Sequence, residues 1–246
     1  MVIDIANLNS KEKFALLYGI MLGDGCLSLV NGNKKFISIT GSLDDDLPFY
    51  KEVISLLLNE FRGKDTNIKF RKDCRAIDFN FTDKNLFELI VSNGFPIGKK
   101  GPNLIIPEVF YEDNLLKYIV QGFFATDGSL VLTKNPNKFY PRIESQVIHG
   151  KLLNQIVDYL KKIGMNGRCY DCGIDFNSHW KNTQRKYRFQ FNGKKNLLLF
   201  NENIGFVNPK HIIKFNNFLR YNEEYDSNIK GIPPSKHYLI RSEVKL

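Results

Sequence analysis

The chain has 246 residues, of which 43% are hydrophobic and 25% charged, with 18 Gly and 9 Pro. These ordinary globular proportions exclude a disordered, collagen-like or low-complexity chain, and no apolar run approaches the ~18 residues that a membrane span needs. Four Cys are too few for a disulfide scaffold, so we expect an intracellular, reducing compartment and no membrane partner. The 35 Lys and Arg against 26 Asp and Glu give a formal net charge of +9, which favours a polyanion as partner.

The first predicted elements are a helix and a strand. Ser10 is a suitable N-cap for the helix, and Gly25 is a natural stop residue. Beyond Gly25, Leu27 and Leu29 alternate with smaller or polar residues, and this period of two predicts a strand. The coarse pattern therefore changes from helix to strand at Gly25.

A second helix is predicted from Pro48 to Asn59. The run Asp44-Asp45-Asp46 precedes it, and we interpret the run as a cap and dipole complement rather than a metal site. Two further strands follow, because apolar residues again alternate with polar ones; their apolar residues are Ile68 and Phe70, then Ile77, Phe79 and Phe81.

The chain then repeats this pattern. Residues 17–25 read LYGIMLGDG and residues 120–128 read VQGFFATDG, which places Asp24 and Asp127 103 residues apart. Asp113 or Asn114 is the expected cap of the second motif helix, and Gly128 its stop. Alternating strands follow around Ile143 and Phe189. Each half therefore predicts the order αββαββα.

An Asp at the end of a helix is unfavourable next to the negative end of the helix dipole, unless a cation binds there. One carboxylate is a poor Mg²⁺ site, but two carboxylates, backbone carbonyls, water and a phosphate oxygen complete an octahedron. The two copies supply the two carboxylates if their helices pack side by side. Small residues such as Gly19 and Gly122 permit that close approach. Basic sheets flanking the pair are typical of a nuclease that cuts duplex DNA.

The two motifs resemble those of the LAGLIDADG homing endonuclease family, of the monomeric, two-motif type. The resemblance covers nearly the whole chain, about residues 10–220. It implies an α+β fold of two pseudo-twofold-related αββαββα halves, each with an antiparallel DNA-binding sheet, packed through the two motif helices. We expect a first half over 1–105, a linker over 106–112, a second half over 113–221 and a C-terminal extension over 222–246.

The resemblance also implies the chemistry. Asp24 and Asp127 would hold two or three Mg²⁺ ions, with the backbone carbonyls of Gly23 and Thr126 as further ligands; Mn²⁺ or Ca²⁺ would substitute, Ca²⁺ without cleavage. Hydrolysis would leave 5′-phosphate and 3′-hydroxyl ends with short 3′ overhangs. Further catalytic residues implied by the family are Lys100 (with Lys99 as the alternative), Lys210 and Gln146. The first half has Thr40-Gly41-Ser42 and no Gln at the corresponding place, so the two pockets are expected to differ.

Alternation along the strands predicts which side chains face DNA. Arg and Lys suit guanine, Asn and Gln suit adenine, and loop lysines suit phosphates. The expected set is Ser28, Lys34, Lys35, Asn67, Lys69, Arg71, Asp78, Asn80, Thr133, Lys138, Arg142, Glu144, Lys186, Arg188 and Gln190. The expected partner is double-stranded DNA with a long pseudo-palindromic target, as in intron homing. The alternative is an RNA maturase acting on host intron RNA, or a non-cleaving DNA-binding protein on the same fold.

Overall fold

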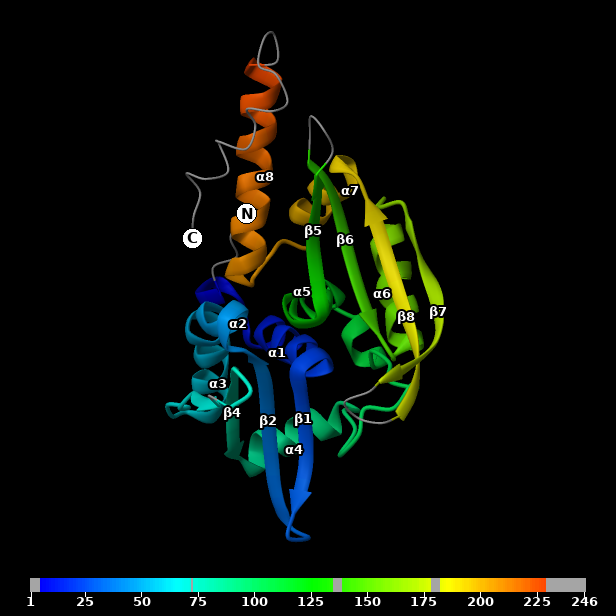
Figure 1. The fold of residues 1–246 in the computed structure, drawn as a ribbon. Helices are drawn as coiled ribbons and strands as arrows, with labels where there is room; N and C mark the ends of the chain where they lie inside the picture. Colours follow the sequence, from blue (N-terminus) through cyan, green and yellow to red (C-terminus); the bar gives the residue numbers. More distant parts are fainter. Residues whose placement is uncertain (1–4, 72, 135–138, 178–181, 229–246) are drawn as a thin grey trace.

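The computed structural model describes residues 5–71, 73–134, 139–177 and 182–228. Two successive sets of elements fill these ranges (Figure 1). The first set is η1 (Ile5–Asn7), α1 (Ser10–Asp24), β1 (Gly25–Val30), β2 (Lys34–Ser42), α2 (Leu43–Phe49), the π-helical turn η2 (Tyr50–Ile54), α3 (Ser55–Arg62), β3 (Lys69–Arg71), β4 (Ala76–Thr82) and α4 (Lys84–Ser92). After η3 (Glu108–Tyr111), the second set is α5 (Leu116–Asp127), β5 (Gly128–Lys134), β6 (Phe139–Val147), α6 (Gly150–Lys162), β7 (Gly167–Asn177), β8 (Asn182–Asn192), α7 (Lys194–Asn203) and α8 (Pro209–Asn228).

Each set forms one antiparallel sheet, and the two sheets have the same topology. The strand orders are β1-β2-β4-β3 and β5-β6-β8-β7, each with hairpin neighbours and one crossover. The repeat of a helix followed by such a sheet confirms the α+β class and the two αββαββα halves. None of the helices in the described ranges combines the length and apolar character that crossing a membrane requires.

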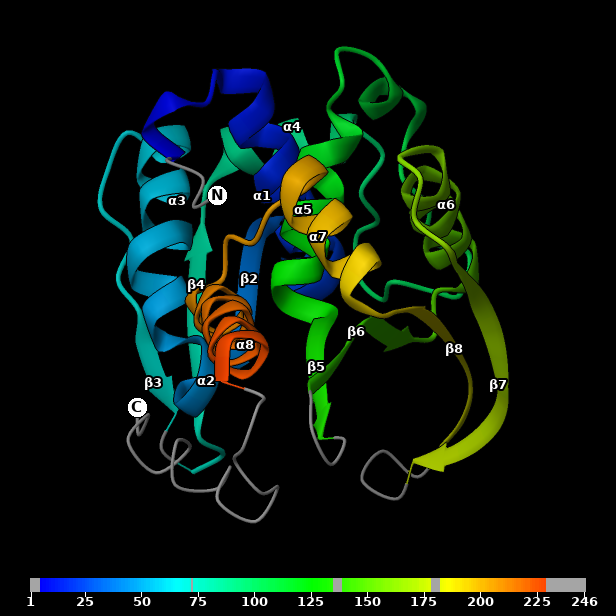
Figure 2. The ribbon, with the colours of Figure 1, turned by 90° about the horizontal axis from the view of Figure 1, so that it is seen from above.

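The helices α1 and α5 lie side by side between the two sheets (Figure 2). They touch backbone to backbone, because a Cβ built on Gly19 would lie 2.3 Å from the carbonyl oxygen of Ile119, and one on Gly122 would lie 2.2 Å from that of Leu16. Real Cβ atoms do not approach so closely. The two glycines therefore set the separation of the helices, as the small residues of both motifs predicted.

The remaining helices cover one face of each sheet. In the first half α2 and α4 pack against β2, and in the second half α6 and α7 pack against β8. The covered faces carry the alternating apolar residues: Leu27, Ile37 and Phe79 are fully buried, and so are Ile143 and Phe191. Within the described ranges, no helix layer covers the opposite face of either sheet (Figure 2).

The starts of both motif helices differ from the prediction. The N-cap of α1 is Asn9, whose side chain accepts a hydrogen bond from the Glu12 N–H while the Glu12 carboxylate accepts one from the Asn9 N–H. This reciprocal capping box leaves Ser10 as the first helical residue. Neither Asp113 nor Asn114 caps α5. Both adopt left-handed backbone, with φ of 52° and 59°, and form the turn before the helix.

The glycines that follow the two motif helices are required because a side chain would not fit there, and neither adopts left-handed backbone. Gly25 and Gly128 follow α1 and α5 with extended backbone, at φ of −83° and −86°. A Cβ on Gly25 would lie 2.5 Å from the Cα of Met21, and one on Gly128 would lie 2.2 Å from the ring of Phe124. The chain thus turns from helix into strand directly after each Asp.

The predicted helix over Pro48–Asn59 begins five residues earlier, at Leu43. Ser42 is its N-cap, and the Asp run lies in its first turn as expected. Pro48 lies inside the helix and lacks the N–H for one helical hydrogen bond, and the π-helical turn follows directly. At the other end of the chain, α8 runs to Asn228, so the expected boundary at residue 222 falls inside a helix.

Candidate active site and nucleic-acid interface

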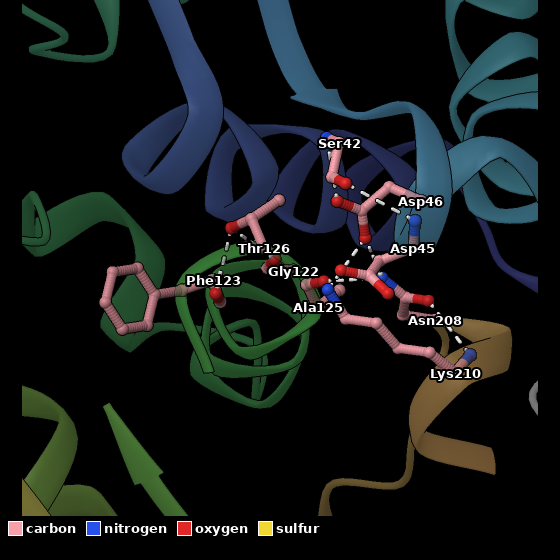
Figure 3. A network of polar contacts seen from close by, with 9 residues as sticks. All are labelled: Ser42, Asp45, Asp46, Gly122, Phe123, Ala125, Thr126, Asn208 and Lys210. Carbon is pink, nitrogen blue, oxygen red and sulfur yellow. Dashed lines mark hydrogen bonds and ion pairs between the residues drawn. The ribbon is translucent and has the colours of Figure 1, made fainter. Parts of the chain in front are cut away.

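Asp24 and Asp127 are the last residues of α1 and α5, and the crossing of these helices brings them together. A Cβ on Gly23 would lie 2.0 Å from the Thr126 Oγ1 and 3.4 Å from the carboxyl carbon of Asp127. Only a glycine before Asp24 therefore lets the second motif approach. The Thr126 hydroxyl donates to the Phe123 carbonyl at 2.9 Å, which holds it against its own helix (Figure 3).

The pair of carboxyl groups is electrostatically costly. Burial, the charge of Asp127 and the charge of Asp46 raise the pKa of Asp24 to about 8, against the opposing effect of Lys100 and Lys210. Burial also raises the pKa of Asp127. Two partly desolvated carboxylates that share a site favour binding of a proton or a cation between them.

Lys100 approaches this pair from the first half. Its ammonium group donates hydrogen bonds to the carbonyl oxygens of Met21 (3.3 Å), Leu22 (3.0 Å) and Gly23 in the last turn of α1, where carbonyls lack full helical partners. Burial lowers the pKa of Lys100, while the charges of Asp127 and Asp24 raise it. Lys100, and not Lys99, is thus the lysine that reaches the two aspartates.

Lys210 approaches from the second half and binds a different kind of group. Its Nζ lies 2.7 Å from Oδ1 of Asp46, a residue of the first half (Figure 3). The same oxygen accepts a hydrogen bond from Nδ2 of Asn208 at 3.0 Å, and that nitrogen also donates to the Ala125 carbonyl at 2.8 Å. The other carboxylate oxygen, Oδ2, accepts from the Ser42 N–H at 3.1 Å.

Gln146 lies at the end of β6, one residue beyond the partner of Gly128 in the sheet. Its Oε1 accepts a hydrogen bond from Nε of Arg188 at 2.9 Å, and its side chain is exposed. In the first sheet the partner of Gly25 is Ile39, so the register identifies Thr40 as the counterpart of Gln146. The two halves therefore differ at this position, as predicted.

Comparison with known proteins agrees with this geometry. Residues 114–205 match the family model of the LAGLIDADG-like domain. The whole fold resembles the I-LtrWI LAGLIDADG homing endonuclease bound to target DNA, at 13% identity and a TM-score of 0.52, covering 91% of this chain and 92% of that one. The chain therefore has the two-domain fold of these LAGLIDADG proteins, and residues 114–205 match the family's domain model.

Two further solved structures have the same LAGLIDADG fold. The LAGLIDADG meganuclease I-AabMI bound to uncleaved DNA matches at 14% identity and a TM-score of 0.53, covering 86% of this chain and 91% of that one. I-DmoI in complex with DNA and Ca matches at 14% identity and a TM-score of 0.52, covering 80% and 91%. Among curated protein sequences, none matches this chain with significance.

The two aspartates fit a divalent cation by their donor chemistry, since Mg²⁺ prefers hard carboxylate oxygens and keeps several waters. In the described ranges no three His, Cys, Asp or Glu side chains form a ready-made ligand set, so two protein carboxylates are what this site offers. The carbonyl of Gly23, an expected ligand, accepts a hydrogen bond from Lys100. A cation at that carbonyl would have to share it with the lysine.

The second LAGLIDADG sheet places its predicted residues on the face that the helices leave free. The register puts Glu144 opposite Gln190 and Gln146 opposite Arg188, on one face with Arg142. Neighbouring side chains on this face are linked by an ion pair and a hydrogen bond. Nε of Arg142 lies 2.7 Å from Oε2 of Glu144, and Gln190 donates to the same oxygen at 3.0 Å. Thr133 and Lys186 lie on the same face; Nζ of Lys186 lies 2.6 Å from Oδ2 of Asp175.

The first sheet matches the prediction less completely. Ser28, Lys69, Arg71 and Asn80 lie on the free face, by their register with β2 and β4. Asp78 shares that face but is only 2% exposed, and its Oδ1 has no hydrogen-bond partner. This burial removes Asp78 from the side chains available to a base edge.

Four expected DNA contacts lie outside this set, and two of them do not fit the structure. Lys35 lies on the helix-covered face, opposite Leu29, where its Nζ forms an ion pair with Glu88 of α4, so we drop it from the interface. Asn67 precedes β3 and lies outside the sheet, because the strand begins only at Lys69. Lys34 is exposed at the start of β2, as a phosphate contact requires. Lys138 lies outside the described residues.

Four residues that the sequence reasoning missed belong to these surfaces. Asp46 and Asn208 link the two halves beside Asp24 and Asp127. Arg168 and Tyr170 of β7 lie on the free face of the second sheet, opposite Gln190 and Arg188, with the guanidinium 4.7 Å from the ring centroid of Tyr170. The alternation Gly167-Arg-Cys-Tyr170 carried the signal for the last two.

Proposed function

We propose that the chain is a site-specific endonuclease that hydrolyses both strands of double-stranded DNA with the help of divalent cations, in the first place Mg²⁺. The observation that carries this proposal is the meeting of Asp24 and Asp127 at the ends of two crossing helices, with a lysine from each half beside them. A purely structural helix end gains nothing from a buried carboxylate next to another one.

The carboxylates of Asp24 and Asp127 would hold the cations, with the carbonyls of Gly23 and Thr126 as candidate further ligands. The cation supplies a water of lowered pKa and stabilises negative charge on the phosphate and on the leaving oxygen. Addition of this water to phosphorus and cleavage of the bond to the 3′ oxygen would leave a 5′-phosphate and a 3′-hydroxyl, with short 3′ overhangs. Two or three ions would serve the two strands, with Mn²⁺ as a substitute and Ca²⁺ supporting binding without cleavage.

The chain's own residues have distinct tasks in this reaction. The ammonium groups of Lys100 and Lys210 would donate hydrogen bonds to phosphate oxygens or to the attacking water, where charge develops. Gln146 would orient water in the second pocket through its amide. Its counterpart Thr40 has one hydroxyl and a shorter reach, so the two strands would be cut at different rates.

The free faces of the two sheets would lie along the major groove. Their Arg, Lys, Asn and Gln side chains suit base edges, and exposed lysines such as Lys34 suit phosphates. The net charge of +9 supports binding to a polyanion. Because one chain contains both halves, a single copy would cover a long pseudo-palindromic target as a monomer.

The test is cleavage of a randomised DNA library in Mg²⁺, with sequencing of the cut ends. We expect one family of long sites cut on both strands, no cleavage by Asp24→Asn, and full cleavage by the matched surface variant Asp158→Asn on the exposed side of α6. Equal cleavage by wild type and Asp24→Asn would refute the proposal. Tight RNA binding without cleavage of any DNA would favour a maturase instead.

A further inference from the structure

The inference concerns Asp46, an acid of the first half that is only 8% exposed. Its Oδ2 accepts from the Ser42 N–H and thereby completes the cap of α2. The cap does not need the other oxygen, which receives Lys210 and Asn208 from the second half (Figure 3). One carboxylate thus ends a helix in one half and binds two side chains of the other.

Lys100, the corresponding lysine of the first half, is not bound by a carboxylate of the other half in this way. Lys100 donates to three main-chain carbonyls at the end of α1, within its own half, rather than to a carboxylate of the other half. Gly98 lies two residues before Lys100, and a Cβ built on it would have no neighbouring atom within 4 Å. The corresponding residue of the second half is Asn208. The Asn208 amide therefore belongs to one pocket alone.

Asp46 itself also has no acidic counterpart in the second half. Counting four residues from the end of β6 leads to Lys151, and counting to the fourth residue of α6 leads to Leu153. Neither side chain can accept a hydrogen bond from a lysine. The acid in one half and the amide in the other therefore form a single pairing, found on one side of the pseudo-twofold axis.

We propose that Asp46 is a positioning residue that holds Lys210 beside the catalytic aspartates, so that cleavage of one DNA strand depends on a contact between the halves and cleavage of the other does not. The inference rests on the proposed endonuclease function. A lysine side chain has four rotatable bonds and a compact charge, so it needs partners to keep one position. Asp46 binds the ammonium group of Lys210, and the side-chain Oδ1 of Asn208 accepts from the Lys210 main-chain N–H at 3.1 Å, so both ends of the residue are held.

The experiment measures the cleavage rate of each strand separately, on a target found by the library selection, with each 5′ end labelled. The variants are Asp46→Asn, Lys210→Met, their combination, and Lys100→Met. Asp46→Asn keeps an oxygen for the Ser42 cap but presents an amide to two hydrogen-bond donors. The matched control is Asp45→Asn, the same change one residue earlier at an exposed position. Circular dichroism and DNA binding in Ca²⁺ verify that each variant is folded.

We expect Asp46→Asn to slow one strand by roughly 10- to 100-fold, as small displacements of a catalytic group do, so that nicked DNA accumulates. The slowed strand should be the one that Lys210→Met slows, Lys100→Met should slow the opposite strand, and the double variant should be no slower than Lys210→Met alone. Equal slowing of both strands, or multiplying effects in the double variant, would overturn the inference while leaving the endonuclease intact. A wild type that cuts no DNA would instead refute the proposed function, and the inference with it.

Discussion

Replacing Asp24 by Asn should stabilise the cation-free protein, and by an amount that grows with pH. The pKa of Asp24 is raised to about 8 from its ordinary 3.8, chiefly by burial and by Asp127. Between these values the folded protein retains a proton that the unfolded chain has lost. The free energy of unfolding therefore falls as pH rises through this window, and below pH 4 both states are protonated and the effect disappears.

The size of the effect follows from the linkage relation. One retained proton gives a slope of about 1.4 kcal/mol per pH unit, so wild type should lose roughly 3 kcal/mol between pH 5 and pH 7 that Asp24→Asn does not lose. The Asn side chain has the same shape and never carries a charge. At pH 7 the variant should therefore be the more stable protein, and the difference should shrink toward pH 4, where the carboxyl group is protonated in both states.

Urea denaturation in EDTA at pH 5, 6, 7 and 8 measures this difference. Asp158→Asn is the control, since it removes an exposed carboxylate outside the site. Excess Mg²⁺ should reverse the order at pH 8, because the cation binds the ionised pair and stabilises wild type by mass action. Parallel stability curves for wild type and Asp24→Asn across this pH range would refute the assigned proximity of the two aspartates.

Three further outcomes can be measured. Gly19→Ala should lower the free energy of unfolding by about 1–3 kcal/mol, because its Cβ meets the Ile119 carbonyl, although Ala alone would favour a helix by about 1 kcal/mol; a variant as stable as wild type in urea would contradict this contact. Asn196→Ala should cost about 2–3 kcal/mol by the same assay, since this buried amide bonds both the N–H and the carbonyl of Asn166 and the carbonyl of Asn192. DNA affinity in Ca²⁺, measured by fluorescence anisotropy, should fall steeply with salt as phosphate contacts release counterions; a flat response would argue against the proposed interface.

The sequence predicted those features that depend on local order along the chain. The motif helices and the strands followed from periods of 3.6 and 2, and the repeat of Asp24 at Asp127 supplied the symmetry. Lys35 could have been placed correctly from the same rule, because it is two residues from the buried Ile37 and so shares its face. The helix starts were harder to predict, since Asn9 and Ser10 are both favourable N-cap residues and only the backbone conformation decides between them.

The contacts between the halves could not be predicted. Asp46 and Lys210 are 164 positions apart, and no periodicity links them. Their pairing results from how α2 of the first half meets the start of α8, which depends on the packing of α1 on α5. An alignment of residues 97–100 with 207–210 places Asn208 opposite Gly98, but it does not reveal what the amide binds.

The shared carboxylate of Asp46 has a consequence for redesign of this molecule. Recombining halves from different parents is a natural way to obtain a chimera with a new recognition sequence. In such a chimera Asp46 would come from one parent, and Asn208 and Lys210 would come from the other. A chimera that has only one side of this contact would contain an unpaired charge at the interface between its halves. Such a hybrid should be constructed with the acid, the amide and the lysine transplanted together.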